Sequence, residues 1–308
     1  MTTISVIVCT FNRAESLRET LQALNVQALP AGVTLEIIVV NNNSSDHTPA
    51  VVHDAAEAAR WPIHYCVESR QGKSYALNKG IEVATGALLA FTDDDVVPTP
   101  TWVQALHEAF VTHQADCVGG KILPRWIQPP PAWLQRSEAW SYLALLDRGE
   151  TVKQAGPKDG DFLYGANLAI RREALTALGL FRTDLGPNGT TPSRCEDSEM
   201  LQRLLSAGRR TVYTPHAVVY HTVQPERMRL AYIRRWKFHA GRSSVRMNPP
   251  KSGRLSLWLA RECLTNGIGA LWAYTRRLQD VAIQREALFW SQLGRIIGTL
   301  DLQWQRHR

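Results

Sequence analysis

The stretch "GALLAFTDDDVVP" (residues 86–98) joins an apolar run directly to three consecutive carboxylates, Asp93, Asp94 and Asp95. The segment "ALLAFT" (87–92) has the composition of a strand buried on both faces. Adjacent carboxylates raise one another's pKa unless a cation lies among them, and oxygen ligands suit Mn²⁺ or Mg²⁺. The stretch therefore indicates either a solvated turn whose acids cap backbone donors or a metal site at a strand end.

Similar apolar runs recur through the first half of the chain and alternate with segments of helical periodicity. This alternation predicts an α/β layer with a mostly parallel sheet and flanking helices. The other expected strands are residues 4–10, 35–41, 63–68 and 116–122, and the expected helices are residues 13–27, 74–84 and 101–110.

A polar cluster follows each of the first four expected strands. The clusters are "TFNR", "NNNSSD", "ESRQGKS" and "TDDD". Ligands of parallel α/β sheets bind beyond the carboxyl ends of the strands, so four such clusters predict a binding crevice. The chain has no G-x-G-x-x-G and no complete G-x-x-x-x-G-K-[ST] pattern, which argues against a dinucleotide fingerprint and a P-loop.

A second acidic pair, Glu196 and Asp197, begins the segment "EDSEMLQRLLSAG", in which apolar residues recur at helical spacing. Acids in a first helical turn can simply complement the helix dipole. They can also act as a general base and its support, so the sequence leaves both interpretations open.

The overall composition suits a soluble globular protein with one large domain or two smaller ones. Its 308 residues include five scattered cysteines without a C-x-x-C pair, which favours a reducing compartment and no structural zinc. The N-terminal segment reads as a strand rather than a signal peptide, and no run of 18 apolar residues occurs. We therefore expect a cytoplasmic protein.

The charge is divided unevenly along the chain. Residues 1–225 hold 19 Lys and Arg against 23 Asp and Glu, whereas residues 226–308 hold 16 against 5. We expect a domain boundary near Gln224-Pro225, with a catalytic domain at 1–225 and a basic amphipathic helical extension at 226–308. Cationic helices with tryptophan suit an anionic membrane surface. Packing on the catalytic domain or on a second subunit remains an alternative, the oligomeric state is open, and no recognition motif supports nucleic acid as a partner.

An ordered set of motifs resembles the family 2 glycosyltransferases, which have the nucleotide-sugar-binding fold called GT-A. The motifs are "SVIVCTFNR", "EIIVVNNNSSDHT", "RQGKSYALNKGIEVATGALLAFTDDDVVP", "GANLAIRREAL", "CEDSEMLQRLLSAG" and "VYTPHAVVYH", spanning residues 5 to 221. The resemblance implies an inverting, metal-dependent hexosyl transfer from a nucleotide-sugar to a hydroxyl of a glycan or lipid-linked acceptor. It also implies a setting such as bacterial surface polysaccharide synthesis, whereas peripheral attachment to the inner membrane face is expected from the basic segment at 226–308.

The resemblance also implies residue roles. Asp95 would bind Mn²⁺ or Mg²⁺ at the donor diphosphate, with Asp93 and His221 close to the metal. Asp197 would act as general base, supported by Glu196. The residues expected around the donor are Thr10, Phe11, Asn12, Arg13, Asn41, Asn42, Arg70, Lys73, Asp93, Asp94, Gly165 and Asn167.

One departure from the family pattern concerns the nucleobase. Many relatives place an aspartate where Asn41 or Asn42 stands, to accept a hydrogen bond from uracil. An amide carbonyl can accept the same bond without charge. UDP is therefore the first choice, and dTDP and GDP stay open.

Three other classes compete with this interpretation. A nucleotidyltransferase would need a Gly-rich, basic loop for a triphosphate, which is not seen. A glycoside hydrolase also uses paired carboxylates but needs no nucleotide. A non-catalytic nucleotide- or glycan-binding protein would not need both Asp95 and the Glu196-Asp197 pair.

Overall fold

The computed structural model describes residues 2–135, 137–159, 162–189, 193–250 and 255–306. The chain divides into two compact units. Unit 1 comprises Met1–Arg125, Ala144–Thr183 and Glu196–Thr222; unit 2 comprises Trp126–Leu143, Asp184–Cys195 and Val223–Arg308. Unit 2 thus includes two segments that precede residue 225, and the domain boundary expected there stays a prediction.

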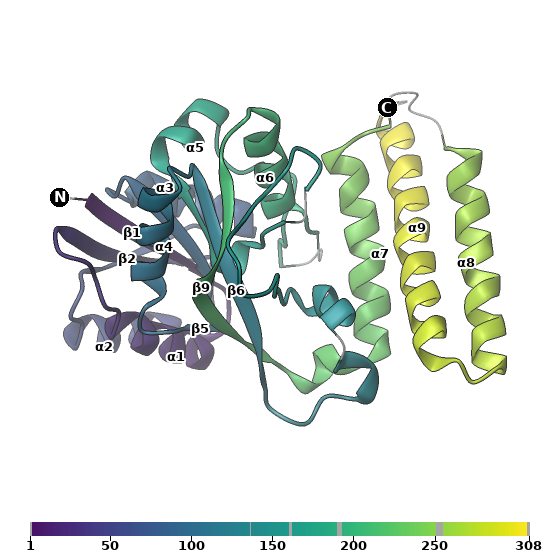
Figure 1. The fold of residues 1–308 in the computed structure, drawn as a ribbon, viewed down its shortest axis with the longest axis horizontal. Coiled ribbons are helices and arrows are strands. Elements are labelled where there is room, and N and C mark those ends of the chain that lie inside the picture. Colours follow the sequence, from purple (N-terminus) through teal and green to yellow (C-terminus); the bar gives the residue numbers. More distant parts are fainter. Residues whose placement is uncertain (1, 136, 160–161, 190–192, 251–254, 307–308) are drawn as a thin grey trace. The chain divides into compact units, whose positions relative to one another are not determined.

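Unit 1 is built on a mixed sheet with the strand order β3-β2-β1-β4-β8-β6-β9-β5, and β7 pairs with β9 (Figure 1). Strands β1 to β4 pair in parallel, as predicted, and the pairings of β4–β8, β6–β8, β5–β9 and β7–β9 are antiparallel. The strands are β1 (Thr2–Thr10), β2 (Val33–Asn41), β3 (Ile63–Val67), β4 (Leu88–Asp93), β5 (Val96–Pro98), β6 (Cys117–Trp126), β7 (Lys153–Gln154), β8 (Leu168–Arg171) and β9 (Thr211–Val223).

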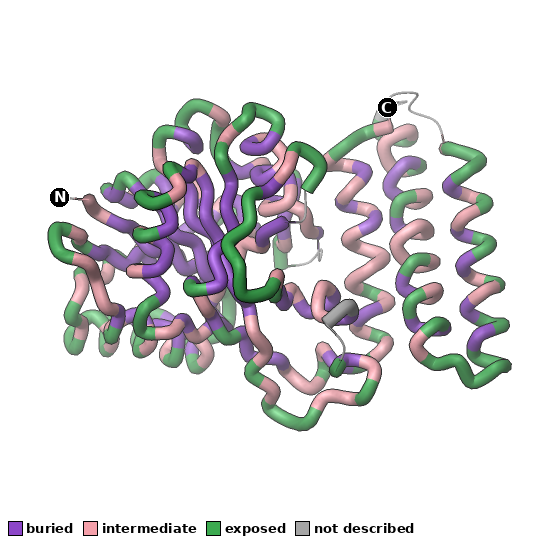
Figure 2. Tube along the Cα trace, in the orientation of Figure 1, coloured by how far each residue is buried: buried purple, intermediate pink, exposed green. Residues whose placement is uncertain are grey.

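The parallel strands form the core because helices cover the sheet. Residues 6–8 of β1 and 37–40 of β2 are completely buried, and the sheet is the largest buried region of unit 1 in Figure 2. Gly80 lets α3 pack closely, since a Cβ there would lie 2.5 Å from Ile7 Cγ2. The helices of this unit are α1 (Ala14–Asn25), α2 (Thr48–Glu57), α3 (Lys73–Val83), α4 (Trp102–Thr112), α5 (Arg172–Leu178) and α6 (Glu196–Ser206), with the short 3-10 helix η3 (Gly165–Asn167).

Unit 2 contains the three long C-terminal helices α7 (Leu230–Met247), α8 (Leu257–Thr275) and α9 (Gln279–Arg306). Helix α9 packs against both α7 and α8 (Figure 1). The ion pairs Arg234–Glu286 and Arg242–Asp301 show that α7 and α9 run parallel. Their backbones approach closely at Gly294, where a Cβ would lie 2.0 Å from the carbonyl oxygen of Phe238. The other 3-10 helices are η1 (Ala132–Leu134), η2 (Ser137–Leu143) and η4 (Pro225–Met228).

The α/β sheet with flanking helices and a C-terminal helical segment is confirmed. No helix among the described residues combines the length and the apolar character needed to cross a bilayer.

Candidate active site

The strand register brings the polar clusters to one edge of the sheet. Thr10 at the end of β1 lies beside Asn41 of β2, and Cys9 lies beside Asp93 of β4. Strand β1 lies between β2 and β4, so the strand order reverses at β1. Open α/β sheets bind ligands at such a switch point, and the expected crevice is therefore located at the carboxyl ends of β1 and β4.

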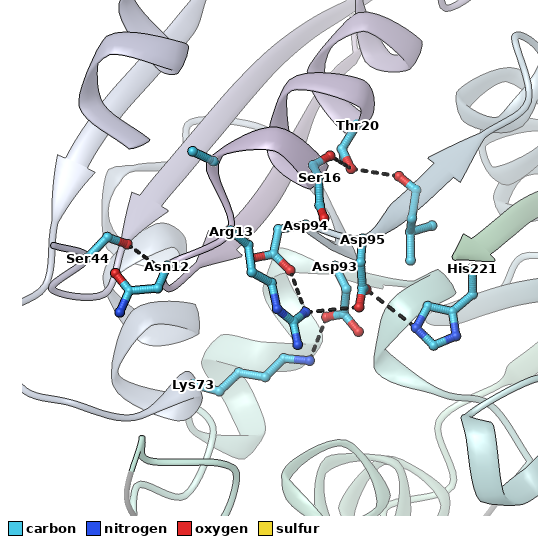
Figure 3. Close-up of polar contacts among 12 residues, drawn as sticks. Asn12, Arg13, Ser16, Thr20, Ser44, Lys73, Asp93, Asp94, Asp95 and His221 are labelled. Carbon is cyan, nitrogen blue, oxygen red and sulfur yellow. Dashed lines mark hydrogen bonds and ion pairs between the residues drawn. The ribbon is translucent and has the colours of Figure 1, made fainter. Parts of the chain in front are cut away.

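Arg13 neutralises two members of the acidic triplet. Its Nη1 lies 2.9 Å from Oδ1 of Asp94 and 2.9 Å from Oδ2 of Asp95, and both carboxylates are buried (Figure 3). Burial raises the pKa of Asp94 to about 6, although Arg13 acts in the opposite direction. The sequence suggested a metal as the cation that relieves this repulsion; the structure shows that a side chain of the protein already does so.

Lys73 is the second cation at the triplet. Its Nζ lies 2.6 Å from Oδ1 of Asp93 and 3.8 Å from Oε1 of Glu196. Burial lowers the pKa of this lysine, but the two carboxylates outweigh burial and raise it above the usual value. Lys73 is therefore charged at neutral pH. It is the first residue of α3.

Glu196 and Asp197 begin α6 and face the same region. Oδ2 of Asp197 accepts a hydrogen bond from the backbone N–H of Gly165 at 2.9 Å, which ties α6 to η3. Burial, together with the charge of Asp197, raises the pKa of Glu196 to about 7, against the effect of Lys73. These interactions give the pair specific partners, so it does more than complement the helix dipole.

A pocket brings five of the expected site residues together. Lys73, Asp93, Gly165, Glu196 and Asp197 line it, and these come from α3, β4, η3 and α6. Sequence reasoning missed the remaining lining residues, although position at a strand end could have indicated two of them, Cys9 and Thr92. The complete additional set is Cys9, Leu77, Phe91, Thr92, Leu168 and Phe181.

The apolar part of this pocket is fixed by its own contacts. The rings of Phe91 and Phe181 meet edge to face at 5.4 Å, and Asn78 exchanges two hydrogen bonds with the backbone of Phe181. Burial raises the pKa of the Cys9 thiol, so this cysteine is not a thiolate at neutral pH.

Asp95 also lies close to His221. Nε2 of the imidazole is 3.4 Å from Oδ1 of Asp95, and both side chains are buried. The register of β5 with β9 explains this proximity, because His221 pairs with Val96, the residue after Asp95. The structure therefore joins two of the three residues expected near the metal.

The loops after β1 and β2 are held together by side-chain amides. Asn12 adopts a φ of +53°. Its backbone N–H donates to Oγ of Ser44, and its side-chain Oδ1 accepts from the backbone N–H of Ser45. Asn41 is buried, donates from Nδ2 to the hydroxyl of Tyr65, and accepts from the N–H of Ser44. Thr10 is buried beside these loops, whereas Phe11 is exposed.

Asn42 holds the loop that leads into α3. Its Nδ2 donates to the carbonyl oxygens of Glu68 and Arg70, and its Oδ1 accepts from the N–H of Gly72. The side chain of Arg70 is largely exposed and pairs with Glu68 at 2.8 Å. Both amide hydrogens of Asn42 are thus used within this loop, whereas Asn41 donates one hydrogen bond, to Tyr65, and accepts one, from Ser44.

Asn167 lies beneath the site and not at its surface. Its Oδ1 accepts from Nε1 of Trp102, and its Nδ2 donates to the carbonyl oxygens of Lys121 and Ala217. The residue is completely buried and does not line the pocket. Asn167 thus joins α4, β6 and β9 inside unit 1, and its expected place among the residues around the donor stays a prediction.

The chain belongs to glycosyl transferase family 2, whose model matches residues 5–179. The resemblance of the sequence motifs to this family is confirmed, and the protein is a glycosyltransferase.

Curated relatives support this assignment. Glucosyl-dolichyl phosphate glucuronosyltransferase of Haloferax volcanii is 26% identical over 227 residues, covering 71% of this chain and 68% of that protein. The succinoglycan biosynthesis protein ExoM of Rhizobium meliloti is 28% identical over 250 residues, covering 81% and 76% of the two chains.

The fold matches a solved structure. The mannosyltransferase PcManGT from Pyrobaculum calidifontis, solved in complex with GDP-Man and Mn²⁺, aligns with a TM-score of 0.64 at 21% identity, covering 95% of this chain and 86% of that chain. The expected GT-A fold is thereby confirmed.

Proposed function

We propose that this protein is an inverting, metal-dependent glycosyltransferase that moves a sugar from a nucleotide-diphosphate donor to a hydroxyl of a glycan or lipid-linked acceptor. One observation carries the proposal: Lys73 and Asp93 share a single pocket with Glu196 and Asp197. Side chains that can bind a diphosphate, on α3 and β4, thus line the same pocket as carboxylates of α6 that can deprotonate a hydroxyl.

The diphosphate of the donor would lie at the ends of β1 and β4. Lys73 and Arg13 are the cations there, and each is held by carboxylates of the triplet. In the donor complex, phosphate oxygens would share these cations, which would stabilise the negative charge of the departing nucleoside diphosphate. This assignment makes Arg13 and Lys73 donor-binding residues.

A divalent cation fits the ligand atoms near Asp95. A carboxylate oxygen and an imidazole nitrogen approach within 3.4 Å, and such a donor set suits Mn²⁺. Within the described part of the chain, no group of three or more His, Cys, Asp and Glu side chains is arranged for a metal. Asp95 and His221 would therefore hold the ion together with diphosphate oxygens. The bound ion would act as a Lewis acid for the leaving group.

Asp197 would act as the general base. Its carboxylate would take the proton of the acceptor hydroxyl while that oxygen forms the bond to the anomeric carbon and the bond to the nucleoside diphosphate breaks. Its hydrogen bond from Gly165 orients the carboxylate in the pocket. A single displacement of this kind inverts the anomeric configuration.

Uracil is the base we favour, with Asn41 accepting a hydrogen bond from its ring N–H. Guanine and thymine are the alternatives. For the acceptor, a lipid-linked sugar is suggested by the name of the Haloferax volcanii relative, a glucosyl-dolichyl phosphate glucuronosyltransferase.

A panel of UDP-, GDP- and dTDP-sugars with Mn²⁺ tests the proposal. We expect slow hydrolysis of one donor that releases a nucleoside diphosphate and a free sugar, with loss of the signal in EDTA. Release of pyrophosphate would support a nucleotidyltransferase. Sugar release from glycans without a nucleotide would support a glycoside hydrolase, and donor binding without turnover under any condition would support a binding protein.

A further inference from the structure

Helix α8 is apolar on two opposite faces. Its inner face packs on α9: Leu259, Cys263 and Ala270 are buried, and Cys263 lies beside the carbonyl oxygen of Phe289. Its outer face carries Leu264, Ile268 and Leu271, whose exposed fractions are 64%, 59% and 69%. The spacing of i, i+4 and i+7 places these three side chains on one side of the helix.

This outer apolar face extends toward both ends of α8. Trp258 near the start and Trp272 near the end are exposed to 61% and 54%. We call Trp258, Leu264, Ile268, Leu271 and Trp272 the α8 face. Exposed turns recur along the whole length of α8 in Figure 2. Five large apolar side chains along one helix form a surface of the kind that marks an interaction site.

Positive charge accompanies the α8 face. Arg261 is exposed on the helix, and Arg276 and Arg277 follow its last turn directly. Among the described residues these arginines form no ion pair, whereas Glu286 and Asp301 of α9 are paired with arginines of α7. These two acids of α9 are thus paired with α7 and not with the arginines that flank the α8 face.

We propose that the α8 face binds the surface of an anionic lipid bilayer, with α8 lying in the plane of the interface. Leu264, Ile268 and Leu271 would enter the acyl boundary, and the tryptophans would lie at headgroup level. No helix in the described part of the chain is suited to crossing the bilayer, which agrees with an in-plane position.

Charge favours a bilayer over a second copy of the chain. Residues 226–308 hold 16 Lys and Arg against 5 Asp and Glu. Two copies meeting through this segment would bring like charges together, whereas anionic headgroups would attract the arginines. The proposal concerns a surface of unit 2 and does not depend on donor chemistry, so vesicle binding is measured without a nucleotide or acceptor.

The test is flotation of the full chain with vesicles of phosphatidylcholine containing one third phosphatidylglycerol. The wild type should float with these vesicles, bind pure phosphatidylcholine less, and lose binding in high salt. The variant Leu264→Ser/Ile268→Ser/Leu271→Ser should bind the anionic vesicles more weakly by on the order of tenfold or more, since it removes buried apolar area. A matched control, Val26→Ser/Val111→Ser/Leu180→Ser, changes three exposed apolar residues of unit 1 and should float like the wild type.

The thermal unfolding of both variants shows whether they fold, and Arg261→Gln/Arg276→Gln/Arg277→Gln provides a second variant. Loss of flotation in this arginine variant with anionic vesicles supports the proposal even if the serine variant is unstable. The proposal would be overturned if the wild type stayed in the soluble fraction with every vesicle composition. It would also be overturned if the wild type bound no vesicles and was a dimer in light scattering, while the serine variant was a monomer.

Discussion

The guanidinium of Arg13 lies 2.9 Å from the carboxylate of Asp95, the residue that we expect to bind the metal. The same nitrogen contacts Asp94, so one half-exposed cation balances two buried carboxylates. A metal ion bound as we propose would therefore compete with this cation for one acidic site. In the donor complex a phosphate would offer Arg13 another partner, which would couple metal binding to donor binding.

Replacing Arg13 with Gln tests this competition. The variant leaves two buried carboxylates without their cation, so we expect a melting temperature several degrees lower than that of the wild type. Millimolar Mn²⁺ should raise the melting temperature of the variant more than that of the wild type, because the ion can replace the lost charge. Arg18→Gln, which changes an arginine paired only with exposed acids, is the control. Equal Mn²⁺ responses in all three proteins would show that Arg13 does not compete with the metal.

Asp197→Asn tests the general base. We expect kcat at saturating acceptor to fall by about 10²–10⁴, the usual contribution of general-base catalysis, with nucleotide affinity in Mn²⁺ nearly unchanged. Steady-state rates and calorimetry on the same preparation separate the two effects. Glu173→Gln, at another acid in the first turn of a helix, should keep normal turnover. If Asp197→Asn also turns over normally, its role is confined to tying α6 to η3.

Glu196 predicts a specific dependence of stability on pH. Burial raises its pKa from the ordinary 4.5 to about 7, so folding favours the protonated acid. The stability from this group is fully present below about pH 4.5 and is lost as the pH rises toward and through 7. Glu196→Gln should therefore gain thermal stability relative to the wild type by a few degrees at pH 8, and the difference should shrink steadily toward pH 4.5. A difference in melting temperature that does not change with pH would contradict the assigned pKa.

Asn167→Ala should destabilise the fold without acting on the donor directly. It leaves three buried polar groups, on Trp102, Lys121 and Ala217, without their partner, and we expect a loss of about 3 kcal/mol in the free energy of unfolding. Asn25→Ala, whose side chain makes hydrogen bonds near the surface, should cost less than about 1 kcal/mol. Urea unfolding followed by circular dichroism provides both values. A nearly neutral Asn167→Ala with weakened nucleotide binding would contradict this structural role and favour a direct contact with the donor.

The parallel half of the sheet could be predicted because its strands are buried on both faces and therefore read as continuous apolar runs. The edge at which Thr10, Asn41 and Asp93 meet followed from the same pattern, since parallel strands end on one side. The short strands β5, β7 and β8 could not be predicted, because segments of two to four residues carry no periodicity.

The site was less accessible to sequence reasoning where partners lie far apart in the chain. Arg13 and Asp95 are 82 residues apart, and no local pattern indicates their ion pair. The three hydrogen bonds of Asn167 inside unit 1 could not be predicted either, because their partners lie 46 to 65 residues away in the chain. On α8, helical spacing places Leu264, Ile268 and Leu271 on one side of the helix, but only the fold shows that this side is exposed.

The central claim is that a nucleoside diphosphate and a divalent cation bind together at the strand ends next to Asp95. Calorimetric titration of UDP, GDP and dTDP into the wild type and into Asp95→Ala, with Mn²⁺ and with EDTA, tests it most directly. We predict that one nucleotide binds the wild type only with Mn²⁺ and does not bind the folded variant measurably. Binding that is equal in the wild type and Asp95→Ala, or no binding of any of the three nucleotides to the wild type with Mn²⁺, would contradict the claim.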